Sequence, residues 1–206
     1  MKRIRGLYVI VDPDACRGRS PVEVARLALE GGASVIQWRD KRRDKGEQLA
    51  DARAILALCR ERGVPFIVND HADLAWALRA DGVHVGQRDL PAPLVRALLP
   101  QAIVGVSTNN ADEARRAVAE GATYVAVGSV FPTRTKAAIR PADPDRVRQV
   151  RAAVDVPVVA IGGIDASNVD LVIAAGADAA AVISAVCGAD DPKEAARALA
   201  SRFERT

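Results

Sequence analysis

The chain has 206 residues, of which 50% are hydrophobic, so it can form one well-packed domain within the size range of a single α/β barrel. Its net charge of +3 and its aromatic content of 3% argue against a nucleic-acid partner, which needs clustered positive charge or stacking platforms. No apolar run approaches the roughly 20 residues that span a bilayer, so no membrane partner is expected. Three widely spaced cysteines without a C-x-x-C pair favour a reducing, cytoplasmic location.

Short β-branched runs alternate along the chain with longer segments rich in Ala, Leu and Arg. In chain order, strands are expected at 7–11, 34–38, 65–68, 82–85, 103–106, 124–127, 156–161 and 179–183. Helices are expected between them, at about 21–31, 46–62, 71–79, 91–98, 110–120, 143–153, 167–175 and 192–203.

Such alternation predicts a parallel sheet. Glycines recur just before strands, at Gly32, Gly121 and Gly176, where they suit the ends of helices. Eight units in one chain predict a (β/α)8 barrel that comprises residues 1–206 as a single domain. A doubly wound open sheet is the alternative.

The second expected strand carries an unusual polar row, Gln37, Arg39 and Lys41, which alternates with Ile36 and Trp38. Side chains of a strand alternate between its two faces, so the three polar residues should point the same way and Trp38 should pack against the outer helices. Burying unpaired charge costs several kcal/mol or more. We therefore expect an anion to meet this row.

Other unusual residues also follow expected strands, where barrels carry their chemistry. After strands seven and eight, Gly163 and the pair Ile183 and Ser184 suit a phosphate site built from backbone N–H groups, although a plain glycine turn is the alternative. After strands three and four, Asp70 and Asp89 suit Mg²⁺, which binds one or two carboxylates together with substrate phosphates. Each aspartate could instead cap the helix that follows it.

A third set combines cations and hydroxyl groups that suit a departing phosphate. Its members are Arg39, Lys41, Lys136, Ser107, Thr133 and Thr135. Lys136 lies in a long segment, 128–142, and could be an ordinary exposed lysine. A Schiff base on Lys41 or Lys136 also stays open. Two anion sites, one with metal and one without, indicate two phosphorylated small-molecule substrates.

Several catalytic motifs are absent. The chain has no G-x-S-x-G, no Walker A run and no G-x-G-x-x-G, so serine hydrolase, ATP and NAD chemistry are not indicated. The two histidines are His71 and His84, and His84 lies within an expected strand, where a structural role is predicted.

Seven segments together resemble the thiamine phosphate synthase family, in the right order over nearly the whole chain. They are 37–41 (QWRDK), 68–70 (VND), 81–89 (DGVHVGQRD), 105–108 (GVST), 127–136 (VGSVFPTRTK), 160–164 (AIGGI) and 182–184 (VIS). The resemblance implies a (β/α)8 barrel that joins hydroxymethylpyrimidine diphosphate to thiazole phosphate and releases pyrophosphate.

The resemblance also implies a role for each matching residue. The pyrimidine diphosphate would be held by Gln37, Arg39, Lys41 and Asn69, with Ser107 on the pyrimidine and Lys136 on the pyrophosphate. Asp70 and Asp89 would hold Mg²⁺. The thiazole phosphate would be bound by Thr133, Thr135, Gly163, Ile183 and Ser184. Of these, Lys136, Arg39 and Lys41 are the expected catalytic residues.

Two positions depart from the family pattern, namely Asn109 where the family has histidine and Ala137-Ala138 where it often has an aspartate. Three alternatives carry weight: a thiazole tautomerase of similar fold, a non-catalytic thiazole or thiamine phosphate binder, and a phosphoribosyl-anthranilate-type isomerase. The first should lack some cations, the second needs no metal, and the third does not explain paired aspartates. A homo-oligomer is compatible with the sequence.

Overall fold

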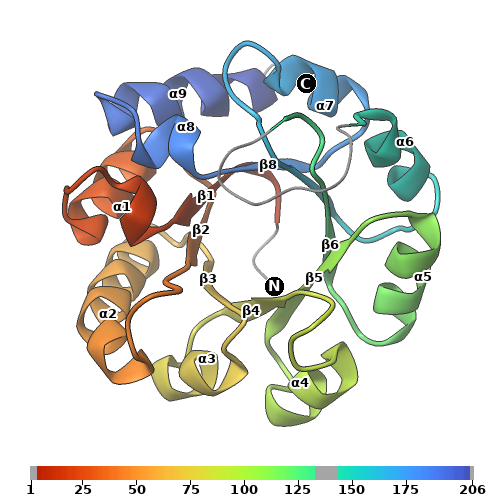
Figure 1. The fold of residues 1–206 in the computed structure, drawn as a ribbon, viewed down its shortest axis with the longest axis horizontal. Helices are drawn as coiled ribbons and strands as arrows, with labels where there is room; N and C mark the ends of the chain where they lie inside the picture. The colour runs from red at the N-terminus through yellow and green to blue at the C-terminus, as the bar shows by residue number, and fades with distance from the viewer. Residues whose placement is uncertain (1–3, 133–142, 205–206) are drawn as a thin grey trace.

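The computed structural model describes residues 4–132 and 143–204 of the chain. Eight parallel strands run in chain order around a closed barrel, and β1 pairs with β8 to complete it (Figure 1). This confirms the (β/α)8 prediction and excludes the open sheet, which would leave two strand edges unpaired. The strands are β1 (Gly6–Val11), β2 (Val35–Trp38), β3 (Phe66–Asn69), β4 (Gly82–Val85), β5 (Ile103–Thr108), β6 (Tyr124–Val127), β7 (Val158–Ile161) and β8 (Ala179–Val182).

The helices form a ring outside the strands (Figure 1). Each strand is followed by a helix, as the alternating pattern predicts. The helices are α1 (Pro21–Glu30), α2 (Lys45–Glu61), α3 (Ala72–Leu78), α4 (Ala92–Leu98), α5 (Ala111–Ala119), α6 (Asp145–Arg151), α7 (Val169–Ala174), α8 (Ser184–Cys187) and α9 (Pro192–Phe203), with a short 3-10 helix, η1 (Pro13–Ala15). None of the described helices is long and apolar enough to cross a membrane.

Two apolar cores lie on opposite sides of the strands. The outer core joins the strands to the helices and includes Ile36 and Trp38. The inner core fills the barrel and includes Tyr8, Val35 and Tyr124. The two cores divide the side chains of each strand alternately, so the facing predicted for β2 is confirmed.

Short elements account for the main differences from the predicted elements. Neither η1 nor α8 was expected, because three or four residues are too few to show helical periodicity. The helix expected at about 91–98 begins one residue later, because Pro91 is the residue before α4. Ser20 caps α1, and its side chain accepts from the backbone N–H of Glu23.

Candidate active site

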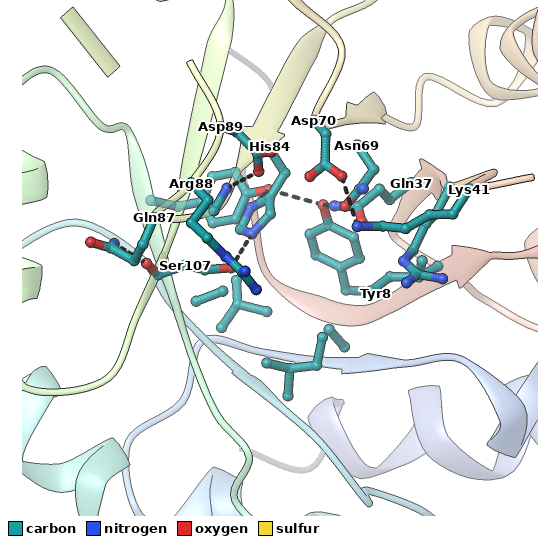
Figure 2. A pocket seen from close by; sticks show the side chains of 18 residues that line it. Tyr8, Gln37, Lys41, Asn69, Asp70, His84, Gln87, Arg88, Asp89 and Ser107 are labelled. Carbon is teal, nitrogen blue, oxygen red and sulfur yellow. Dashed lines mark hydrogen bonds and ion pairs between the residues drawn. The ribbon is translucent and has the colours of Figure 1, made fainter. Parts of the chain in front are cut away.

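A cavity of about 630 Å³ is lined by residues of all eight strands and of the loops that follow β2, β3 and β4 (Figure 2). Polar side chains from several strands and the loops that follow them meet there, as the barrel predicts. The lining residues are Tyr8, Ile10, Gln37, Arg39, Lys41, Asn69, Asp70, His84, Gly86, Gln87, Arg88, Asp89, Ser107, Tyr124, Ala126, Val159, Ile161 and Ala181.

The polar row of β2 and its following loop lines this cavity, with Gln37, Arg39 and Lys41 all present. Trp38 lies on the other side of the strand, where its indole Nε1 donates to Gln48 of α2 at 3.1 Å. The alternation of the sequence therefore placed these side chains correctly. Asn69 and Ser107, predicted beside them, also line the cavity.

The charges of the row have partners within the chain. The guanidinium of Arg39 pairs with Asp12, whose side chain is 5% exposed. The ammonium of Lys41 lies 3.1 Å from the Asp70 carboxylate. Anionic groups therefore do meet these cations, but in the chain alone they are the carboxylates of Asp12, just after β1, and Asp70. A ligand phosphate that binds Arg39 or Lys41 must therefore share the cation with its carboxylate partner or displace that carboxylate.

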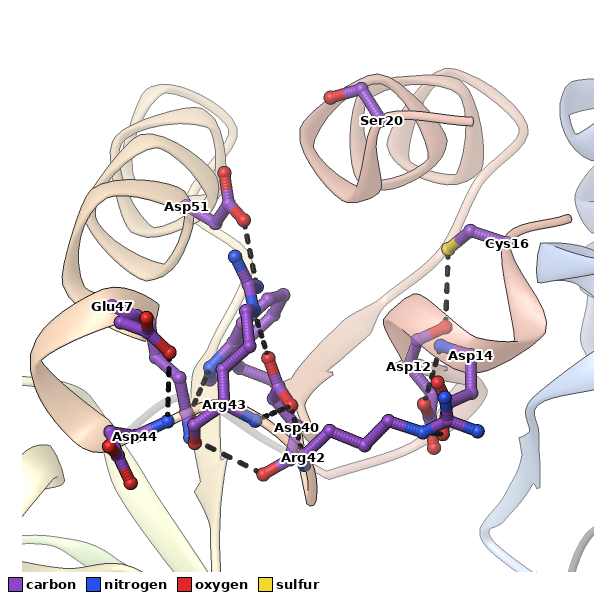
Figure 3. A network of polar contacts seen from close by, with 12 residues as sticks. Asp12, Asp14, Cys16, Ser20, Asp40, Arg42, Arg43, Asp44, Glu47 and Asp51 are labelled. Atoms are coloured by element: carbon purple, nitrogen blue, oxygen red, sulfur yellow. Dashed lines mark hydrogen bonds and ion pairs between the residues drawn. The ribbon is translucent and has the colours of Figure 1, made fainter. Parts of the chain in front are cut away.

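The loop between β2 and α2 is held by a second polar network (Figure 3). Asp40 accepts from the backbone N–H groups of Arg42 and Arg43, at 2.9 and 3.1 Å, and from Arg43 Nε at 2.6 Å. Arg43 also donates to Asp51 of α2 at 2.9 Å, and Arg42 pairs with Asp14 at 2.8 Å. Burial opposes ionisation of Asp40, but these hydrogen bonds prevail and lower its pKa. The network fixes the backbone on both sides of Asp40, and with it the directions of the neighbouring cations.

Asp70 and Asp89 come together in the cavity, as predicted (Figure 2). Neither caps a helix: the residue before α3 is His71 and the residue before α4 is Pro91. Asp89 instead accepts from the backbone N–H of Gly86 at 2.7 Å. The alternative reading of these aspartates as helix caps is therefore excluded.

The surroundings of Asp70 also affect its ionisation. Burial raises the pKa of Asp70, the Lys41 ammonium opposes the rise, and the nearby Asp89 carboxyl adds to it. No group of three or more His, Cys, Asp or Glu residues that could hold a metal occurs among the described residues. Two crowded carboxylates without a third protein ligand fit Mg²⁺, which completes its shell with water and substrate phosphate.

A second cavity of about 760 Å³ lies beside the first and shares Arg39 and Lys41 with it. Gly163 and Ser184 line it, and Ile183 is the residue directly before α8. A Cβ atom on Gly163, whose φ is +65°, would lie 2.3 Å from the carbonyl oxygen of Pro132. The turn after β7 therefore requires glycine, and it brings backbone close to the second cavity as the predicted phosphate site requires.

Three predicted site residues, Thr133, Thr135 and Lys136, lie outside the described residues. The chain that leads to them, up to Pro132, borders the second cavity.

Sequence reasoning missed several residues of the main cavity. Tyr8 and Tyr124 point into the barrel, and His84, read as structural, lines the cavity between Tyr124 and Ser107. The signal that could have found them is that polar-tipped side chains stand within apolar strands, where alternation places them on the face toward the barrel interior. Arg88, in the loop after β4, is exposed at the cavity and makes no hydrogen bond or ion pair with any described residue.

Comparisons with known proteins agree on one family. The family model described as "Thiamine monophosphate synthase" matches residues 7–186. The chain is 50% identical over 195 residues to the thiamine-phosphate synthase of Moorella thermoacetica, covering 94% of this chain and 93% of that one. It is 47% identical to the thiamine-phosphate synthase of Shouchella clausii, covering 99% and 98%. A solved thiamine phosphate pyrophosphorylase from Pyrococcus furiosus superposes with a TM-score of 0.89 at 38% identity, covering 97% and 96%.

Proposed function

The chain belongs to the thiamine monophosphate synthase family and carries that family's activity in thiamine biosynthesis, and on this premise we propose how its site works. The enzyme joins 4-amino-2-methyl-5-hydroxymethylpyrimidine diphosphate to thiazole phosphate and releases pyrophosphate. The observation that carries the proposal is the meeting of Arg39, Lys41, Asp70 and Asp89 in one cavity. Cations and metal-binding carboxylates together suit a departing diphosphate.

The pyrimidine diphosphate occupies the main cavity. Gln37, Asn69 and Ser107 contact the substrate, with the pyrimidine toward the inside of the barrel. The diphosphate lies toward the mouth, between the cations of the β2 row and Arg88 of the β4 loop (Figure 2). We assign the stabilisation of leaving charge to Arg39, Lys41 and Lys136, with Arg88 as an added positive charge on the opposite wall.

Asp70 and Asp89 would hold Mg²⁺ beside the diphosphate. When bound, the ion neutralises charge on the leaving pyrophosphate. In the chain alone, burial and then the nearby Asp89 carboxyl raise the pKa of Asp70, and a bound cation would favour its ionised form. Lys41, which pairs with Asp70 in the chain alone, would then be available to the substrate diphosphate.

The thiazole phosphate occupies the second cavity. Its phosphate is bound by Gly163, Ile183 and Ser184, with Thr133 and Thr135. The wall of this cavity also carries Arg39 and Lys41, so the two substrates meet at the β2 row. Two adjoining cavities of this kind suit a reaction between two phosphorylated molecules.

The bond changes need no general base. The C–O bond between the pyrimidine methylene and the diphosphate breaks, and its electron pair leaves with pyrophosphate. The resulting cation is stabilised by the aminopyrimidine ring, and the lone pair of the thiazole nitrogen forms the new C–N bond. Because no proton is transferred, fixed charges that stabilise the leaving group are the main requirement.

The tautomerase alternative is less well supported. It releases no diphosphate and would have no use for paired aspartates beside several cations. The relatives named above are all synthases. We also propose small phosphorylated partners, as the activity requires, and a cytoplasmic location, supported by three buried cysteines that form no disulfide, Cys16, Cys59 and Cys187.

A direct assay tests the function. The protein is incubated with both substrates and Mg²⁺, and thiamine phosphate and pyrophosphate are measured. We expect both products in equal amounts. Isomerisation of the thiazole without release of pyrophosphate would contradict the synthase assignment and support the tautomerase.

A further inference from the structure

A continuous chain of hydrogen bonds follows the inner wall of the main cavity (Figure 2). Gln37 Nε2 donates to the phenol oxygen of Tyr8 at 2.7 Å, and the phenol oxygens of Tyr8 and Tyr124 lie 2.9 Å apart. His84 Nδ1 lies 2.9 Å from the Tyr124 oxygen, and His84 Nε2 lies 2.9 Å from Ser107 Oγ. The bond changes proposed above give Tyr8, Tyr124 and His84 no role. We call these three residues the relay.

Both phenols of the relay keep their protons. Tyr8 is 1% exposed and Tyr124 is fully buried. Burial raises the pKa of each phenol far above that of a free tyrosine. Each therefore carries one O–H group and can donate one hydrogen bond.

The amide group of Gln37 sets the direction of the chain. Gln37 Nε2 can only donate, so the phenol oxygen of Tyr8 accepts this hydrogen bond. The buried O–H of Tyr8 then needs an acceptor, and the phenol oxygen of Tyr124 is that acceptor. Tyr124 then donates to His84 Nδ1, so the imidazole proton lies on Nε2 and is donated to Ser107. Each bond in the series determines the next one.

Two groups at the ends of the chain are left facing the cavity. The hydroxyl of Ser107 accepts from His84, so its own proton is free to be donated. The Gln37 Oε1 atom has no hydrogen-bond partner among the described residues and is an acceptor. The cavity wall thus offers one donor and one acceptor in a defined arrangement.

We propose that the relay selects a 4-aminopyrimidine against its 4-oxo analogue by holding this arrangement. The proposal rests on the function assigned above, which places the pyrimidine here. The exocyclic amine donates to Gln37 Oε1, and a ring nitrogen accepts from the Ser107 hydroxyl. In the 4-oxo analogue a carbonyl oxygen faces Gln37 Oε1, so two acceptors oppose each other. Turning the Gln37 amide would require every bond of the relay to reverse.

The substitution Tyr124→Phe interrupts the relay in the middle while keeping the aromatic ring. The measurement is kcat/KM for the 4-amino and 4-oxo pyrimidine diphosphates, at saturating thiazole phosphate and Mg²⁺. We expect the ratio of the two values to fall by about tenfold or more, because Gln37 and Ser107 become free to reorient. An equal loss with both substrates, or no loss with either, would overturn the proposal.

A matched control removes a buried hydroxyl from the other face of the same strand as Ser107. Thr108 Oγ1 donates to the Ala126 carbonyl at 3.3 Å and lies outside the cavity. The Thr108→Val variant should keep the wild-type ratio. If Tyr124→Phe does not fold, Tyr8→Phe interrupts the relay one position earlier and should give the same fall.

A binding measurement separates this proposal from the proposed function. Calorimetric titration with the unphosphorylated 4-amino and 4-oxo pyrimidine alcohols should show the same loss of preference in Tyr124→Phe. If the wild-type protein makes no thiamine phosphate, the proposed function fails. If it makes thiamine phosphate but the variant keeps the wild-type preference in both measurements, only the relay proposal fails.

Discussion

Among the described residues, three positively charged side chains line the main cavity, and they differ in their partners. Arg39 pairs with the buried Asp12, and Lys41 pairs with Asp70. Arg88 is exposed and makes no hydrogen bond or ion pair with the described residues. A phosphate that contacts Arg39 or Lys41 must compete with a carboxylate, whereas Arg88 can engage it directly. Arg88 should therefore contribute to substrate affinity more than to the chemical step.

Replacing Arg88 tests that assignment. In Arg88→Ala we expect the KM for the pyrimidine diphosphate to rise about 5- to 20-fold, a loss of about 1–2 kcal/mol from one partly exposed charged contact, with kcat less affected. Steady-state kinetics at saturating thiazole phosphate measure this. The control is Arg53→Ala, which removes an exposed arginine from α2 and should leave KM unchanged. An unchanged KM in Arg88→Ala would remove this residue from the site.

Asp70 is a proposed metal ligand, and keeping its carboxylate charged destabilises the folded state. Burial and the neighbouring Asp89 raise its pKa despite the Lys41 ammonium, so the charged carboxylate is less favourable in the fold than in the unfolded chain. A raised carboxyl pKa gives no penalty at pH below the unfolded pKa. The penalty grows as the pH rises between the unfolded and folded values, and is complete above both.

The Asp70→Asn variant should therefore be more stable and less active than the wild type. Thermal unfolding at pH 7 in EDTA should show a melting temperature higher by up to about 4 °C, which is about 1 kcal/mol in a chain of this length. The difference should vanish below about pH 4, where Asp70 is protonated in both states. Synthesis of thiamine phosphate should fall steeply. A variant that melts below the wild type at pH 7 would show that the Lys41 pair outweighs the penalty.

At the scale of elements, the loop between β2 and α2 fixes the positions of the cations Arg39 and Lys41. Asp40 organises this loop by accepting hydrogen bonds from two backbone N–H groups and from Arg43, which also pairs with Asp51 (Figure 3). Its side chain is 3% exposed, so the charge is stabilised almost entirely by these partners. The loop is therefore a rigid support for Arg39 and Lys41.

Asp40→Asn weakens this support. We expect the free energy of unfolding to fall by about 1–3 kcal/mol, because a hydrogen bond to a charged group is replaced by a neutral one. The pKa of Asp40 is lowered in the fold, so its contribution is present above the unfolded pKa of about 3.9 and is lost as the pH falls through the folded value. The KM for the diphosphate substrate should also rise, since the neighbouring cations lose their fixed directions.

Urea unfolding from pH 3 to pH 8 measures this pH dependence. The difference between Asp40→Asn and the wild type should be constant from pH 5 upwards and shrink in acid. Asp112→Asn, which removes a carboxylate that is 94% exposed from a pair on α5, should change stability by less than about 1 kcal/mol. A pH-independent difference for Asp40→Asn would mean that packing, not charge, stabilises the loop.

How far each element could be predicted depended on its length. Long segments such as α2 show a clear apolar stripe, and its predicted start differs from Lys45 by one residue. By contrast, η1 and α8 have three and four residues and no periodicity to detect. Their positions follow from barrel contacts: Arg17 and Arg19 of the β1–α1 loop donate to the carbonyl oxygens of Gly188 and Ala189, just after α8. Such contacts cannot be read from either segment alone.

At the scale of the molecule, the site exists only in the closed barrel. Its residues lie on strands from β1 to β8, and the two cavities share the β2 row. Binding of the product pyrophosphate with Mg²⁺ should therefore stabilise the whole fold, because only the folded state presents the combined site.

Thermal unfolding with Mg²⁺ and pyrophosphate tests this coupling. At a ligand concentration of about 100 Kd we expect about 2.7 kcal/mol of stabilisation, which raises the melting temperature by about 5–10 °C. Mg²⁺ alone should give a smaller shift, and EDTA should remove most of the effect of pyrophosphate. Asp89→Asn should respond less to Mg²⁺. An equal shift with and without EDTA would place pyrophosphate binding away from Asp70 and Asp89.

The sequence alone determined the order of strands and helices, the facing of Gln37 and Trp38, and the family. These are local properties, because strand alternation and motif spacing act between near neighbours. The tertiary structure decided how the polar groups pair: Arg39 meets Asp12 across 27 positions, and Tyr8 meets Tyr124 across 116. Strand register and barrel closure, which join distant parts of the chain, create these pairs. The anion expected to meet the polar row is thus supplied, in the chain alone, by the carboxylates of Asp12 and Asp70.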